Sequence, residues 1–112
     1  MDCGIKAIDE IAYAKEKGID FIICDHHVPD DELPPAVAIL NAKRPDATYP
    51  YEHLSGCGVG FKFMQAFALN NGIDFHNLTP LLDLVAVSIA SDIVPIMGEN
   101  RILAYHGLKQ LN

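Results

Sequence analysis

The feature that most constrains the fold is a short apolar run at residues 19–24, which follows a glycine and precedes three polar residues. The run is rich in β-branched and aromatic side chains and is almost continuous in apolar character. Such a run predicts a strand that is buried on both faces of a parallel sheet. Pro29 follows closely and ends the strand, because proline cannot donate a hydrogen bond to a ladder.

The segments on either side of this run predict an α/β arrangement. Residues 5–17 place apolar side chains at helical spacing, and Gly18 suits the end of that helix. A helix, a glycine and a buried strand make up half of a βαβ unit. Residues 36–40 are a second apolar run that predicts another parallel strand, whereas residues 41–51 contain two prolines and predict an irregular loop.

The second half of the chain predicts helices. A glycine-rich turn at residues 55–60 leads into an amphipathic helix that ends near residues 70–72. Thr79 and Pro80 suit a helix start, since threonine can cap and proline fits the first turn. Residues 81–93 are apolar almost all round, which predicts a central position for that helix.

A last helix is expected over residues 99–111, broken or bent near Gly107. The pattern as a whole predicts an α/β fold in which a parallel-sheet core with flanking helices is followed by a mainly helical C-terminal half. We expect one domain over residues 1–112, with an α/β part at 1–41 and a loop-plus-helix part at 42–112.

The charge of the chain limits how it could act on nucleic acid. The formal net charge is -7, from 15 acidic and 8 basic residues. An acidic chain does not attract a phosphate backbone by its overall field. If the protein acts on nucleic acid, bound cations or another domain must supply the positive charge.

The cysteines and the apolar runs indicate the compartment. There are three cysteines, an odd number, and none of them forms a C-x-x-C pair. This usage predicts reduced thiols in a cytoplasmic protein. No apolar run approaches the roughly 18 to 20 residues of a membrane span, so no membrane partner is expected.

Asp25, His26 and His27 directly follow the first predicted strand. Open parallel sheets bind ligands at the carboxyl ends of their strands, so these side chains are candidates for a site. Aspartate and histidine together suit a divalent transition ion. Neighbouring residues on an extended chain point in opposite directions, which predicts different roles for the two histidines. A plain polar turn after the strand explains the triplet equally well.

Two further carboxylates are candidates for the same site. Asp2 lies where a preceding strand would end, and a second carboxylate there could bridge two metal ions; helix N-capping is the simpler explanation. Asp92 follows a long apolar run at the end of a predicted helix, where the helix dipole disfavours an anion. A metal ligand is therefore favoured over a solvated turn carboxylate. Asp83 is explained as an ordinary acid of the first helical turn.

A glycine-rich turn and one arginine are candidates for binding a phosphate of the substrate. Gly58 and Gly60, together with Gly56, could expose backbone N–H groups at a helix start, although close packing of the helix explains them equally well. Arg101 could bind a phosphate through two parallel hydrogen bonds, and its alternative is a salt bridge to Glu99 or Asp92.

These pieces, in this order, resemble the DHH phosphoesterase family, and within it the RecJ-type single-stranded-DNA-specific exonucleases. The resemblance covers nearly the whole chain. It rests on residues 2–5, 21–27, 33–41, 56–62, 81–86, 91–95 and 98–103.

The resemblance implies roles for the candidate residues. Asp2 matches a carboxylate shared between two metal ions, and His26 and Asp92 match further metal ligands. Asp25 supports His26, and His27 is expected near the scissile phosphate. The implied cofactor is Mn²⁺ or Mg²⁺ in a two-metal site.

The implied reaction is hydrolysis of single-stranded DNA from its 5′ end, in DNA repair and recombination. The family's first motif, an Asp-x-Asp pair, should precede Asp2 and does not occur in the chain. We therefore expect a partial DHH domain with about half of the metal site, inactive by itself, whose exposed interdomain surface could form a homodimer. The alternatives are a DHH phosphoesterase that acts on small oligonucleotides or cyclic dinucleotides, and a non-catalytic scaffold module.

Overall fold

The structure is a computed structural model that describes residues 2–111. Its elements follow the order α1 (Ile8–Glu16), β1 (Ile22–Cys24), β2 (Ala38–Leu40), α2 (Gly56–Asn70), the short 3₁₀ helices η1 (Phe75–Asn77) and η2 (Thr79–Leu81), α3 (Leu82–Ser91) and α4 (Gly98–Leu111).

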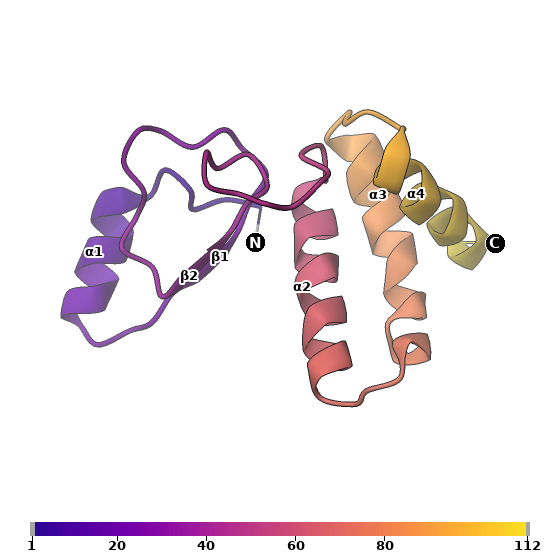
Figure 1. The fold of residues 1–112 in the computed structure, drawn as a ribbon, viewed down its shortest axis with the longest axis horizontal. Helices are drawn as coiled ribbons and strands as arrows, with labels where there is room; N and C mark the ends of the chain where they lie inside the picture. Colours follow the sequence, from indigo (N-terminus) through magenta and orange to yellow (C-terminus); the bar gives the residue numbers. More distant parts are fainter. Residues whose placement is uncertain (1, 112) are drawn as a thin grey trace.

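The elements form two groups, which lie side by side in Figure 1. The first group holds α1, β1 and β2, and we call residues 2–40 the sheet lobe. The second holds α2, α3 and α4, and we call residues 56–111 the helical lobe. Residues 41–55 connect the two lobes without a helix or strand. This arrangement confirms the predicted α/β fold with a mainly helical C-terminal half.

The sheet of the first lobe is parallel, as predicted. Strand β1 pairs with β2 in a register that places Ile23 opposite Ile39. Beyond the strand ends, the N–H of Asp25 donates to the carbonyl of Leu40 at 3.1 Å, and the N–H of Asp2 donates to the carbonyl of Cys24 at 2.8 Å. This backbone hydrogen bond attaches Asp2 to the end of β1.

The prediction that β1 is buried on both faces is wrong. Ile23 and Cys24 are buried, but Phe21 is 41% and Ile22 55% exposed. The described elements cover only part of this strand. The run of apolar residues was therefore a correct signal for a strand and an incorrect one for its burial.

Helix α1 begins at Ile8, later than the predicted start at residue 5. The reason is that the N–H of Ile5 donates to the Asp25 carboxylate at 3.0 Å, so that residue is tied to β1. The helix ends as predicted: the following Gly18 has a φ of +72°, which glycine adopts at little cost.

Helix α2 begins at Gly56, so the predicted glycine-rich turn is the first turn of the helix itself. Ser55 sets this start, because its Oγ accepts a hydrogen bond from the N–H of Gly58 at 3.1 Å. A serine in this position stabilises a helix by satisfying one of its free N–H groups. The predicted end near residues 70–72 is confirmed.

Helix α3 packs against both α2 and α4, which agrees with its predicted central position, but it is buried along one face only. Val85 and Ile89 are buried, whereas Leu84 is 58% and Val87 50% exposed. The predicted cap at its start is wrong. Thr79 donates its hydroxyl to the carbonyl of His76 at 2.9 Å, and η2 leads into the helix.

Helix α4 runs through Gly107 without the predicted break. A Cβ atom at this position would overlap the carbonyl oxygen of Leu82 and lie 2.7 Å from the Cβ of Ala86. Glycine is therefore needed for the close approach of α4 to α3, and it does not interrupt the helix.

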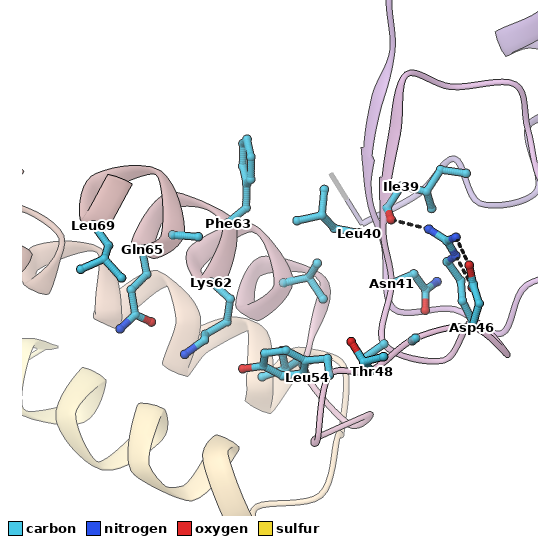
Figure 2. A pocket seen from close by; sticks show the side chains of 16 residues that line it. Ile39, Leu40, Asn41, Asp46, Thr48, Leu54, Lys62, Phe63, Gln65 and Leu69 are labelled. Atoms are coloured by element: carbon cyan, nitrogen blue, oxygen red, sulfur yellow. Dashed lines mark hydrogen bonds and ion pairs between the residues drawn. The ribbon is translucent and has the colours of Figure 1, made fainter. Parts of the chain in front are cut away.

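The core lies mainly in the helical lobe and reaches the sheet lobe through Cys24. Beside this junction is an apolar pocket of about 540 Å³ between β2, residues 41–49 and one face of α2 (Figure 2). Among residues 2–111, no helix combines the length and the apolar composition that a membrane span requires.

Candidate metal centre

The carboxylate of Asp25 holds the end of β1 together. The side chain is 1% exposed. Its Oδ2 accepts a hydrogen bond from the N–H of Ile5 at 3.0 Å. Its Oδ1 accepts from the N–H groups of His26 and His27, at 2.7 and 3.2 Å, and lies 2.7 Å from Nδ1 of His27. Both oxygens are thus occupied by protein donors.

These contacts decide the charge of Asp25. Burial raises the pKa of its carboxyl group, but the hydrogen bonds from Ile5, His27 and His26 outweigh burial and hold the pKa below its usual value. Asp25 is therefore a carboxylate at neutral pH. Its hydrogen bonds fix the backbone of both neighbouring histidines and the ring of His27.

The ring of His27 is held by Asp25 and faces outward. Its Nδ1 donates to Oδ1 of Asp25, which leaves Nε2 as the nitrogen that is directed away from this bond. The side chain is 57% exposed. The backbone carbonyl of His27 accepts a hydrogen bond from Nδ2 of Asn41 at 2.8 Å, so both ring and backbone are fixed.

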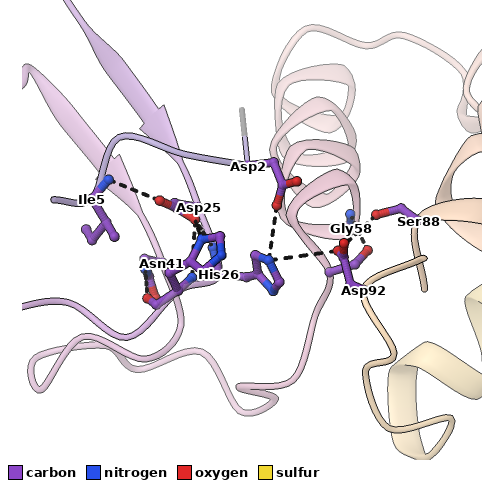
Figure 3. Close-up of polar contacts among 10 residues, drawn as sticks. Asp2, Ile5, Asp25, His26, Asn41, Gly58, Ser88 and Asp92 are labelled. Carbon is purple, nitrogen blue, oxygen red and sulfur yellow. Dashed lines mark hydrogen bonds and ion pairs between the residues drawn. The ribbon is translucent and has the colours of Figure 1, made fainter. Parts of the chain in front are cut away.

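The ring of His26 has a different environment from that of His27. Its side chain is 12% exposed, and Nε2 lies 3.1 Å from Oδ1 of Asp2. The same Nε2 lies 3.8 Å from Oδ2 of Asp92 (Figure 3). One imidazole nitrogen of the sheet lobe therefore faces two carboxylates, one from each lobe.

The two carboxylates are positioned by unusual backbone. Asp2 has a φ of +67°, and Ile93, which follows Asp92, has a φ of +52°. Such values are uncommon outside glycine, above all for a β-branched residue, and they tend to occur at functional sites. Asp92 is held further by Ser88, whose hydroxyl donates to Oδ2 at 3.3 Å.

The alternative explanation of Asp2 as a helix N-cap is wrong. Helix α1 begins at Ile8, and the residue before it, Ala7, makes no side-chain capping bond. The Asp2 side chain instead faces His26. The predicted position of Asp92 at the end of an apolar helix is confirmed, since it directly follows α3.

The donor set fits a divalent metal ion. Ligand atoms of Asp2, Asp25, His26 and His27 lie within 4.8 Å of one another. Asp25 and His27 are hydrogen-bonded to each other, however. We therefore regard Asp2, His26 and Asp92 as the side chains that could hold an ion. One imidazole nitrogen with carboxylate oxygens suits Mn²⁺ and similar ions. The other nitrogen of His26, Nδ1, is buried and has no hydrogen-bond partner among the described residues.

Gly56 and Cys57 lie beside this site. The sequence indicated Gly56 only as part of a possible phosphate-binding turn, and it did not indicate that either residue approaches Asp2. Gly56 lies directly against the Asp2 carboxylate. Burial raises the pKa of the Cys57 thiol, and the negative charges of Asp2, Asp92 and Asp83 raise it further. Cys57 is therefore a neutral thiol beside a cluster of carboxylates. No residue spacing reports either contact, because both arise where the two lobes meet.

The predicted substrate-binding residues have other surroundings. The N–H of Gly58 is engaged by Ser55, and Gly60 is buried further along α2. Arg101 is exposed on α4. Of its two alternative partners, Glu99 pairs with Lys62 at 2.8 Å. Substrate binding by Gly58, Gly60 and Arg101 stays a prediction, and for the glycines the structure supplies a packing role.

Comparison with known proteins extends these observations. Residues 1–89 match the DHH family, N-terminal domain. The chain is 45% identical to the single-stranded-DNA-specific exonuclease RecJ of Bacillus subtilis (strain 168), over 99% of the chain and 13% of that protein. It is 38% identical to the RecJ of Escherichia coli (strain K12), over 99% of the chain and 21% of that protein. The chain thus spans between about an eighth and a fifth of these relatives.

Solved structures agree with the sequence relatives. A crystal structure of exonuclease RecJ bound to manganese matches 96% of the chain and 27% of its own length, with a TM-score of 0.81 and 33% identity. A structure of RecJ in complex with Mn²⁺ from Thermus thermophilus matches 96% of the chain and 16% of its own length, with a TM-score of 0.79 and 32% identity.

Proposed function

Because the chain belongs to the DHH family, we propose that it carries metal-binding residues of an exonuclease that hydrolyses single-stranded DNA from the 5′ end. The observation that carries this proposal is the convergence of the Asp2 and Asp92 carboxylates on one nitrogen of His26. The relatives named RecJ and the manganese-bound structures support the substrate and the ion.

In this proposal Asp2, His26 and Asp92 hold Mn²⁺, with Mg²⁺ as the second candidate. Imidazole is a better ligand for Mn²⁺ than for Mg²⁺, which favours the former. Ions bound there would neutralise charge on a phosphodiester and lower the pKa of water. They would also supply positive charge that a chain of net charge -7 lacks.

His27 is proposed to act on the substrate and not on the metal. Asp25 fixes its ring through Nδ1, and Nε2 is directed outward from an exposed side chain. A histidine oriented in this way can contact a phosphate oxygen near the ion. Asp25 acts through the two histidines, because it fixes the backbone of both and the ring of His27, without touching the substrate itself.

The proposed boundary between the α/β part, residues 1–41, and the loop-plus-helix part, residues 42–112, then separates the metal ligands into two groups. His26 and Asp2 belong to the sheet lobe, and Asp92 belongs to the helical lobe. The site lies where the two meet, so a change in their spacing would change the separation of the ligands.

The function can be tested with the complete gene product and DNA strands labelled at either end. We expect Mn²⁺-dependent release of mononucleotides from the 5′ end of single-stranded DNA, with little attack on duplex DNA. The 112-residue chain offers three of the proposed ligand side chains, and we expect it to bind Mn²⁺ weakly and to degrade little DNA. Exclusive hydrolysis of cyclic dinucleotides or short oligonucleotides would contradict the proposal, as would full Mn²⁺ binding without any hydrolysis.

A further inference from the structure

Gly56 brings the start of α2 directly against Asp2 of the sheet lobe at the candidate metal centre. It is the first residue of α2 and is buried. A Cβ atom built on it would overlap Oδ1 of Asp2 and lie 2.7 Å from the Cβ of that aspartate. The site therefore has room for the Asp2 carboxylate only because residue 56 has no side chain.

The overlapped oxygen is the one that faces His26. Oδ1 of Asp2 lies 3.1 Å from Nε2 of the histidine. Asp2 cannot easily retreat, because its N–H is bonded to the carbonyl of Cys24 at 2.8 Å and its φ is already +67°. A side chain at position 56 would have to move either the carboxylate or the whole of α2.

The position also favours the carboxylate electrostatically. The first turn of a helix carries partial positive charge from N–H groups that lack intrahelical partners. A carboxylate against the first residue of α2 is stabilised by that charge. Contact with Gly56 thus holds the Asp2 side chain in place, and it also fixes how closely α2 approaches the sheet lobe.

We infer that Gly56 is a positioning residue for the metal centre: the absence of a side chain lets the Asp2 and Asp92 carboxylates, one from each lobe, converge on His26. This inference rests on the proposed metal-binding function. Gly56 itself touches neither ion nor substrate. Its role is to allow the distance between the lobes at which the three ligands meet.

The test is the substitution Gly56→Ala in the complete gene product, with Mn²⁺ binding followed by electron paramagnetic resonance of the free ion. We expect the dissociation constant for Mn²⁺ to rise by about tenfold or more, as for other residues that orient metal ligands. The matched control is Gly107→Ala, which introduces a similar clash between α3 and α4 away from Asp2. The control should lose thermal stability but keep its affinity for Mn²⁺.

A double substitution separates positioning of Asp2 from a general packing defect. Asp2→Gly removes the side chain that the new methyl group would strike and suits the positive φ. Asp2→Gly alone should weaken Mn²⁺ binding, and adding Gly56→Ala should weaken it no further. An unchanged Mn²⁺ affinity in Gly56→Ala would overturn the inference. It would also be overturned if the loss of affinity in the double variant equalled the product of the losses in the two single variants.

Thermal unfolding without metal keeps the test decisive if Gly56→Ala folds poorly. Adding Asp2→Gly to Gly56→Ala should then raise the unfolding temperature toward that of Asp2→Gly alone. If the temperature does not rise, the clash between Asp2 and residue 56 is not the cause of the defect, and the inference is overturned. The same measurement separates the two proposals. A wild-type protein that binds no Mn²⁺ would overturn the proposed function, whereas the coupling between positions 2 and 56 would still be measured.

Discussion

Replacing Asp25 by asparagine should lower the free energy of unfolding by about 2–4 kcal/mol, because the change leaves buried donors without a carboxylate. The N–H groups of Ile5, His26 and His27 all donate to Asp25 in the native protein. An amide has only one acceptor oxygen, and its NH₂ group would face one of these donors. Urea unfolding at neutral pH measures the loss. The control is Asp20→Asn, at an exposed aspartate just before the strand, where little change is expected.

The pH dependence gives the same prediction an independent check. The pKa of Asp25 is lowered in the folded protein, so its stabilising effect is fully present above the pKa of an unfolded aspartate, about 3.9. The effect is lost as the pH falls through the lower pKa of the folded state. The difference in unfolding free energy between wild type and Asp25→Asn should therefore be constant near neutral pH and shrink below about pH 4. A difference that grows in acid, or no difference at neutral pH, would contradict the assigned role of Asp25.

Replacing His26 by alanine should reduce the nuclease activity of the complete gene product at least about 100-fold and should also weaken Mn²⁺ binding. His26 supplies the one nitrogen on which Asp2 and Asp92 converge. Without it, two carboxylates remain close together with no imidazole between them. Activity measured over a range of Mn²⁺ concentrations, together with direct binding of the ion, tests this expectation.

His27→Ala is the matched comparison, since it removes the neighbouring imidazole from the same strand end. The ring of His27 is bound to Asp25 and is 57% exposed, so it lies outside the proposed ligand set. This variant should lose activity while its affinity for Mn²⁺ stays close to that of wild type. Equal losses of Mn²⁺ affinity in both variants would show that the two histidines share one role.

Several parts of the fold and site were predictable because they depend on local sequence. The polar triplet at residues 25–27 had to follow a strand, and the parallel pairing of β1 with β2 follows from the intervening connection. Asp92 was predictable as the end of an apolar helix. In each case the signal lies within a short stretch of the chain, where periodicity and capping chemistry act.

Other parts depend on contacts that local sequence does not report. Asp25 accepts a hydrogen bond from Ile5, which is distant in sequence, and that bond also delays the start of α1. Gly56 was predicted as part of a glycine-rich turn that leads into a helix, yet it is the first residue of that helix and makes room for Asp2. Periodicity also overestimated burial for β1 and α3, since it shows that a face is apolar without showing that anything covers it.

An ion held between His26, Asp2 and Asp92 can be located by anomalous X-ray scattering from crystals of the complete gene product grown with Mn²⁺. We expect an anomalous peak about 2.2 Å from Nε2 of His26, within bonding distance of carboxylate oxygens of Asp2 and Asp92. The peak should be absent from His26→Ala crystals and present in His27→Ala crystals. A manganese peak beside His27 and Asp25 instead, or a site that is empty at saturating Mn²⁺, would show that His26, Asp2 and Asp92 do not hold the ion.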